Sequence, residues 1–220
     1  MDALQGAIDV DTNIFFSINR MHNMYFDYFM SAYSGKWVWI PMYAAIWYVM
    51  LRNFHWKVTQ LCMIGLALTI TFADQACATW IRPYVERMRP SNLNNPISEM
   101  VHIVNNHRGG RYGFPSCHAN TFGLAFFLFF LFRKRWLTLF IMAWALLTCY
   151  SRVYLGVHYP GDLLAGTIVG LIGAWLIYRL FVKVSGYKRV EHVTHVYAPI
   201  WVGLLTIAGM LVYAGIRILL

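Results

Sequence analysis

Residues 162–182 read DLLAGTIVGLIGAWLIYRLFV, and this apolar stretch decides the class of fold. Its length matches the roughly 20 residues that an α-helix needs to cross the hydrocarbon core of a bilayer, which is about 30 Å thick. Further apolar runs occur at about 36–51, 58–81, 119–132, 136–154 and 198–219. Two of them, 36–51 and 119–132, are short. The sequence therefore predicts an all-α integral membrane protein, built as a six-transmembrane-helix bundle.

The overall composition agrees with a membrane setting. Hydrophobic residues make up 59% of the 220 residues and charged residues only 12%, which leaves too little polar surface for a soluble domain. No repeat or Pro/Gly-rich linker divides the chain, so we expect a single membrane domain over residues 1–220. Cys62, Cys77 and Cys149 fall in apolar runs, where cysteine behaves as a small hydrophobe, and we expect no disulfides.

The segment before the first apolar run, residues 12–34, has the pattern of an amphipathic helix. Apolar residues recur in it every three or four positions, with Asn13, Arg20, Asn23 and Asp27 between them. This pattern predicts an N-terminal helix that lies in the membrane interface rather than crossing the bilayer. The first dozen residues are acidic and polar, so we expect no signal peptide.

The distribution of Lys and Arg predicts the orientation. With six crossings, the connections 52–57, 133–135 and 183–197 share one side and are rich in basic residues, so that side should be cytoplasmic. The connections 82–118 and 155–161 then face outward, to the periplasm in a host with two membranes. A loop as long as 82–118 is usually functional, and we expect it to be an extracytoplasmic active-site loop. The net charge of +9 divides between the two sides, and nucleic acid is not an expected partner.

Polar residues gather in clusters that the parity of the crossings places on the outer face. Arginine offers a planar fork of donors that matches phosphate oxygens and neutralises the charge of a phosphoryl-transfer transition state. Helix N-termini, which are anion sites, follow two of the clusters. The clusters are Arg82 with Arg89–Pro90, then Pro115–Ser116–Cys117–His118, then Ser151–Arg152 with His158 and Asp162. They predict a phosphate site.

The two histidines suit different steps of phosphoryl transfer. Asp162 follows His158 at i+4, so a proton shared with the carboxylate would leave the other ring nitrogen of His158 free to attack phosphorus. His118 would protonate the leaving oxygen and then activate the water that cleaves the phosphohistidine. This scheme needs no metal and no cofactor.

The order of these clusters resembles the three-part signature of the type 2 phosphatidic acid phosphatase and vanadium haloperoxidase superfamily. The signature is Lys/Arg-x6-Arg-Pro, Pro-Ser-x-His and Ser-Arg-x5-His-x3-Asp, and the resemblance covers about residues 82–162. It implies an all-helical core and a phosphohistidine on His158, with His118 as general acid and Asp162 orienting the nucleophile. The phosphate binders that it implies are Arg82, Arg89, Ser116 and Arg152.

Two positions depart from the family pattern. Arg82 stands where lysine is usual, which keeps the charge but replaces a point charge with a forked donor. Cys117 replaces the glycine of Pro-Ser-Gly-His. If the backbone needs a positive φ there, cysteine strains the turn, and otherwise the replacement is mild. We expect activity to survive, with a thiol beside the phosphate.

Other polar residues have structural as well as functional interpretations. Asp74 lies in an apolar run two turns before Arg82, and a supporting ion pair with that arginine is favoured over direct catalysis. His192 and His195 resemble half of a metal site but are interpreted as loop residues. The stretch 102–111 either grips a head group or forms a flexible connector.

A site at the outer membrane edge favours a phosphate ester on an amphiphile whose tails stay in lipid. The family members of this size suggest lipid A, undecaprenyl pyrophosphate and phosphatidylglycerophosphate or phosphatidate as substrates, and lipid A ranks slightly first because the basic, His-rich loop suits a large anionic head group. The prediction is a metal-independent lipid phosphatase of a bacterial inner membrane, with lipid partners and no required protein partner. Phosphotransfer to another lipid is the enzymatic alternative. Hydropathy disfavours a haloperoxidase, and charges clustered at one edge disfavour a transporter.

Overall fold

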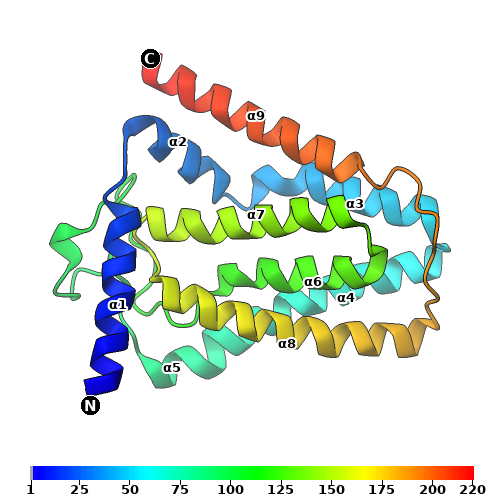
Figure 1. Cartoon of the computed structure of the whole chain (residues 1–220), viewed down its shortest axis with the longest axis horizontal. Coiled ribbons are helices and arrows are strands. Elements are labelled where there is room, and N and C mark those ends of the chain that lie inside the picture. Colours follow the sequence, from blue (N-terminus) through cyan, green and yellow to red (C-terminus); the bar gives the residue numbers. More distant parts are fainter. Residues whose placement is uncertain (1) are drawn as a thin grey trace.

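A computed structural model describes residues 2–220, and within them the chain is helical with no β-strand. The prediction of an all-α fold is therefore confirmed. Its helices (Figure 1) are α1 Asp2–Asn19, α2 Met24–Tyr33, α3 Ile40–Asn53, α4 Trp56–Gln75, α5 Arg82–Val85, α6 Thr121–Phe132, α7 Arg135–Tyr154, α8 Pro160–Ser185 and α9 Ala198–Leu219.

Each of the six predicted apolar runs forms a helix along the long axis of the molecule (Figure 1). Four helical stretches are long and apolar enough to cross a membrane, namely Trp56–Val85, Arg135–Tyr154, Pro160–Ser185 and Ala198–Leu219. The other two runs give α3, with 14 residues, and the shorter apolar helix Cys117–Phe132. The chain is thus a multi-span membrane protein with four full-length candidate spans, and six crossings stay a prediction.

The N-terminal segment differs from the prediction of one helix over residues 12–34. The chain leaves helical geometry between α1 and α2, where the Asn23 side chain caps α2 by accepting a hydrogen bond from the Phe26 amide, 2.9 Å away. A side-chain acceptor at this position favours a new helix start over continuation. Helix α1 crosses the ends of the long helices, whereas α2 packs with α3 along α9 (Figure 1).

Small residues let α8 lie close to its neighbours. A methyl group added at Gly123 of α6 would lie 2.6 Å from the carbonyl oxygen of Gly170 in α8, and one added at Gly173 would lie 2.4 Å from the Phe72 ring. Glycines at such contacts bring helix backbones together in a membrane, where packing rather than water drives association. This close approach fixes the start of α6 against α8, which matters for the site.

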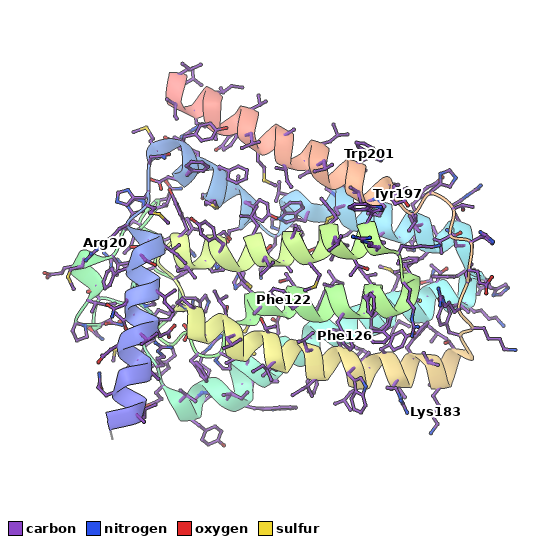
Figure 2. All side chains as sticks on the ribbon, viewed as in Figure 1. Arg20, Phe122, Phe126, Lys183, Tyr197 and Trp201 are labelled. Carbon is purple, nitrogen blue, oxygen red and sulfur yellow. The ribbon has the colours of Figure 1, made fainter. Side chains whose placement is uncertain are left out.

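The two ends of the bundle differ in their connections. The α3–α4, α6–α7 and α8–α9 connections lie at one end, and α1, the segment 86–116 and the α7–α8 turn lie at the other (Figure 1). Arg20 and Lys183 mark these opposite ends in Figure 2. The predicted segregation of the basic connections from the polar clusters is therefore observed.

Candidate active site

The three polar clusters converge beneath the end of the bundle that α1 crosses. Ser116, His158 and Asp162 are fully buried, and Arg89 and Arg152 are only 8% and 7% exposed. Burial of charged groups is costly unless other groups compensate them. The sequence-predicted residues therefore form one compact polar centre.

The α7–α8 turn places His158 and Asp162. Gly156 has φ +75°, a left-handed conformation that favours glycine, and it reverses the chain after α7. At the start of α8, the Asp162 carboxylate accepts a hydrogen bond from the Tyr159 amide at 3.0 Å. The same oxygen, Oδ2, lies 3.4 Å from Nδ1 of His158. The i, i+4 spacing thus brings carboxylate and imidazole together across a helix start.

Arg89 reaches the other side of the His158 ring. It follows Met88, which forms an isolated antiparallel bridge with Tyr112 and so holds this part of the loop extended. Nη1 of Arg89 donates to the Val157 carbonyl at 3.0 Å and lies 2.9 Å from Nε2 of His158. A guanidinium only donates, so Nε2 must be the acceptor and Nδ1 must carry the proton that faces Asp162. This tautomer leaves the lone pair on Nε2.

The surroundings keep His158 neutral. Burial, followed by the positive charges of Arg89, Arg152 and Arg82, lowers the pKa of His158 well below the usual 6.5. Burial and the nearby Arg82 also lower the pKa of Arg89 to about 10, which leaves it protonated at neutral pH. A neutral imidazole beside charged guanidiniums is the protonation pattern that nucleophilic attack on a phosphate requires.

The Pro115–His118 turn lies against α8. The Ser116 amide donates to the Asp162 carbonyl at 2.8 Å, and a methyl group at Gly166 would lie 2.1 Å from the Ser116 carbonyl oxygen. This contact brings the His118 ring to 6.0 Å from the His158 ring, measured between centroids. The two imidazoles of the predicted mechanism are therefore neighbours in the structure.

Cys117 fits the turn without strain. It begins the 3₁₀ helix Cys117–Asn120 and is not among the non-glycine residues with positive φ, so the mild outcome of the glycine replacement applies. Nη2 of Arg82 donates to the Pro115 carbonyl at 2.9 Å and to the Cys117 thiol at 3.2 Å. The thiol therefore contacts a predicted phosphate-binding residue.

Several buried donors at the centre have no protein partner. Among the described residues these include Nε of Arg82, Oγ of Ser116 and Nε of Arg152. Arg152 is otherwise held through Nη1, which donates to Ser34 Oγ. An unpaired buried donor costs about 1–3 kcal/mol, and a tetrahedral anion with acceptor oxygens would satisfy all three. The donor set thus fits a phosphate.

Some side chains act differently from the sequence-based expectations. Asp74 accepts a hydrogen bond from Asn120 at 3.2 Å and, within residues 2–220, forms no ion pair with Arg82, so the predicted pair is wrong. His102 is anchored to the bundle, because its Nε2 lies 2.9 Å from Asp27 Oδ1 in α2. His107 lines a cavity of about 400 Å³ that reaches Arg152.

Sequence reasoning missed Arg87. Its Nη1 lies 3.0 Å from Asp162 Oδ1 and its Nη2 lies 2.7 Å from Asp11 Oδ2 in α1. Residues two apart in an extended segment project to the same side, so the spacing Arg87-x-Arg89 next to a motif arginine was an available signal. No local signal identified Asp11 as its partner.

A second cavity, of about 540 Å³, reaches His118 from between the start of α3 and the end of α4. Aromatic and aliphatic side chains form much of its wall, and Lys36 and Asp74 contribute charge. The lining residues include Lys36, Trp39, Tyr43, Ile70, Asp74, Gln75, Cys117, His118, Trp144 and Thr148. The cavity is mixed in polarity and adjoins the polar centre.

Residues 60–185 match the family model of the PAP2 superfamily. The chain belongs to this superfamily. A lipid A 4'-phosphatase of Bacteroides thetaiotaomicron is 51% identical to it, with 95% of this chain and 97% of the relative covered. An undecaprenyl-diphosphatase of Sulfolobus acidocaldarius is 31% identical, with 67% of this chain and 64% of the relative covered. These PAP2 relatives confirm the prediction of a phosphatase.

A similar fold is found in a solved structure. The crystal structure of Aquifex aeolicus LpxE superposes with a TM-score of 0.57 at 20% identity, covering 76% of this chain and 94% of that one. At this identity the likeness concerns the fold alone. It agrees with the helical arrangement that carries the polar centre.

Proposed function

We propose that this chain is a lipid A phosphatase that removes the 4'-phosphate at the outer face of a bacterial inner membrane. The observation that carries the proposal is the polar centre itself, in which two neighbouring imidazoles lie among three arginines and buried donors that have no protein partner. The 51% identical relative, a lipid A 4'-phosphatase matched over 95% of this chain, supports the choice of substrate.

In the first step, Nε2 of His158 attacks phosphorus. A phosphate oxygen replaces Nε2 as the acceptor for Arg89, and Arg82, Arg152 and Ser116 bind the remaining oxygens. A P–N bond forms while the bond from phosphorus to the sugar oxygen breaks, and His118 gives its proton to that oxygen. The ionised Asp162 stabilises the positive charge that develops on His158.

In the second step, His118 takes a proton from water and the resulting nucleophile attacks the phosphohistidine. The P–N bond breaks, inorganic phosphate leaves, and His158 returns to its neutral state. The sum is hydrolysis of one ester bond by one water molecule. In this scheme arginines neutralise the charge of the transition state, and we propose that it proceeds without a metal or cofactor.

The cavity between α3 and α4 gives a lipid a way to reach His118. Its wall is formed by helices that run along the bundle, so a substrate would move in from the bilayer with its tails still in lipid. Lys36 lies at this cavity and forms no ion pair within the described part of the chain. It is placed to attract an anionic head group as the lipid approaches.

The orientation follows from charge. The bundle end opposite the polar centre carries the basic α3–α4, α6–α7 and α8–α9 connections, and basic connections favour the cytoplasmic side. The polar centre would then face the periplasm. Accessibility labelling of a single cysteine introduced at exposed Tyr84 in intact cells tests this, because a membrane-impermeant reagent should modify it.

The decisive experiment uses detergent-purified protein and matched substrates. Lipid A with its 4'-phosphate should release phosphate, and lipid A lacking only that group should not. The His158→Gln variant should be inactive with both. Release from both lipids at equal rates would contradict the assigned position, and turnover by His158→Gln would remove His158 as the nucleophile.

Undecaprenyl pyrophosphate is the second candidate substrate, because an undecaprenyl-diphosphatase is 31% identical over 67% of this chain. Assay of this pyrophosphate beside lipid A, at equal detergent mole fraction, compares kcat/KM directly. A higher value for undecaprenyl pyrophosphate would reverse our assignment. Adding lipid acceptors tests phosphotransfer, which predicts a phosphorylated lipid in place of free phosphate.

A further inference from the structure

We propose that Arg87 and Asp11 form a positioning relay that holds Asp162 against His158, which makes the N-terminal helix α1 part of the catalytic apparatus. The inference rests on the proposed role of His158 as the nucleophile. The signature specifies neither residue, since Arg87 stands at an unspecified position of the first motif and Asp11 lies outside all three. Asp11 also precedes the segment 12–34 for which the sequence predicted an interfacial helix, although the structure places it in α1.

Arg87 links two carboxylates from different helices. Nη1 lies 3.0 Å from Asp162 Oδ1 and Nη2 lies 2.7 Å from Asp11 Oδ2. The guanidinium also stacks on the Tyr159 ring, 4.0 Å from its centroid. The Arg87 and Asp11 side chains are 22% and 14% exposed, so bulk water screens these contacts only partly. The planar guanidinium of Arg87, stacked on the ring and bound by both carboxylates, has a fixed orientation. The single ammonium group of a lysine could not make both bonds in this geometry.

The contacts of Asp162 show why this direction matters. Oδ2 accepts from the Tyr159 amide at 3.0 Å and faces His158 Nδ1 at 3.4 Å, the longest of its contacts. Oδ1 has Arg87 as its partner. Rotation of the carboxylate would shorten or break the bond to His158, and the bond from Arg87 opposes that rotation. Arg87 therefore holds the angle of the carboxylate that orients the nucleophile, without touching the substrate.

Asp11 fixes the other end of the relay. Its Oδ1 accepts from the Gly161 amide at 2.7 Å, at the start of α8. A methyl group at Gly161 would lie 2.7 Å from Asp11 Oδ2, so the glycine makes room for the acid. Asp11 thus joins α1 both to Arg87 in the loop 86–116 and to the start of α8, the helix that carries Asp162.

Other charges near His158 face it from different directions. Arg89, Arg152, Arg82 and His118 surround its open side, whereas Arg87 is the one arginine or lysine that pairs with Asp162 within residues 2–220. Substitution of Arg87 should consequently change the chemistry of the attack rather than the binding of phosphate.

The test compares four variants in the full-length, detergent-purified protein: Arg87→Gln, Arg87→Lys, Asp11→Asn and the control Asp9→Asn. Asp9 lies on the same helix, is exposed and bonds only Gln5, so its substitution removes an equal charge without touching the relay. Arg87→Gln should lower kcat on the order of 100-fold with little change in KM, as expected for a misplaced reacting group. Asp11→Asn keeps the Arg87–Asp162 contact and should lose roughly 10-fold. Arg87→Lys should recover part of the loss, and Asp9→Asn should match the wild type.

Two readouts separate positioning from folding. Rapid-quench measurement of the acid-labile phosphoenzyme should show slower formation in Arg87→Gln and Asp11→Asn, and the acidic limb of the pH–kcat profile should move in these variants but not in Asp9→Asn. Thermal unfolding identifies variants that lose structure, and Asp11→Asn remains informative if Arg87→Gln does not fold.

The outcomes also distinguish the relay from the function on which it rests. Wild-type protein that forms no phosphoenzyme overturns the nucleophile assignment and the relay with it. Wild-type protein that forms the phosphoenzyme, with Arg87→Gln and Asp11→Asn forming it equally fast, overturns the relay alone. Equal losses in Asp11→Asn and Asp9→Asn also contradict the relay, because general surface charge would then explain the effect.

Discussion

Gly166→Ala should inactivate the enzyme although Gly166 carries no functional group. The added methyl group would lie 2.1 Å from the Ser116 carbonyl oxygen, 3.0 Å from its carbonyl carbon and 3.1 Å from Cβ of Ala119. Ordinary contact begins near 3.4 Å, so the turn or α8 must move by more than 1 Å. The nearest atoms are backbone, which has no flexible end that could swing aside.

This displacement has two measurable costs. Overpacking of a well-packed site costs about 1–3 kcal/mol of stability, and a misplacement of about 1 Å at a reacting group can lower the rate about 100-fold. The Ser116 turn carries both Oγ and the segment leading to His118, so activity should fall much more than stability. We expect kcat/KM for lipid phosphate hydrolysis to drop on the order of 100-fold, with a modest decrease in the unfolding temperature in detergent.

Gly209→Ala in α9 is the matched control, because a methyl group there meets nothing within 4 Å. Alanine also favours a helix over glycine by about 1 kcal/mol, so the control should be as stable as the wild type or more so, with unchanged activity. If Gly166→Ala retains the wild-type rate and unfolding temperature, the close contact between α8 and the Ser116 turn does not position the site, and the reasoning fails.

Three further predictions use single substitutions or pH. Ser116→Ala should lower kcat/KM about 100-fold, because it removes a donor that would bind a phosphate oxygen. It should not destabilise the fold, because the buried Oγ has no protein partner to lose. A large fall in unfolding temperature would contradict this prediction. Cys117→Gly should leave the rate close to wild type, since φ at Cys117 is not positive, and a strong gain in activity would show that the thiol had been strained or obstructive. Because burial and neighbouring arginines hold the pKa of His158 well below 6.5, its imidazole stays neutral as the pH falls through that value, and the acidic limb of kcat/KM should lie below pH 6.5. In the unfolded chain the His158 imidazole binds a proton near pH 6.5, whereas in the folded protein it stays neutral at that pH. The free energy of unfolding should therefore decline as the pH falls below about 6.5, and His158→Asn should remove that part of the decline.

The sequence alone predicted the residues of the candidate site better than the contacts that hold them in place. Arg89, Ser116, His158 and Asp162 were identified because phosphate chemistry restricts the residue types and their spacing, and parity of the apolar runs placed them at one end. The helical class followed from hydropathy. The number of complete spans did not follow from hydropathy, because a run such as α3, with 14 residues, is apolar but short. Its place in the bundle is given by its packing against α9 and α4.

Tertiary structure decided the features that depend on contacts between distant residues. The tautomer of His158 follows from Arg89 on one side and Asp162 on the other, and Asp74 turned to Asn120 instead of the predicted Arg82. Asp11 reaches Gly161 across 150 positions of the chain, a pairing for which no local pattern exists. Hydropathy and motif spacing are properties of short segments, so the sequence determined the helices and predicted the reacting groups, whereas the packing of α1 and α8 determined what holds those groups in place.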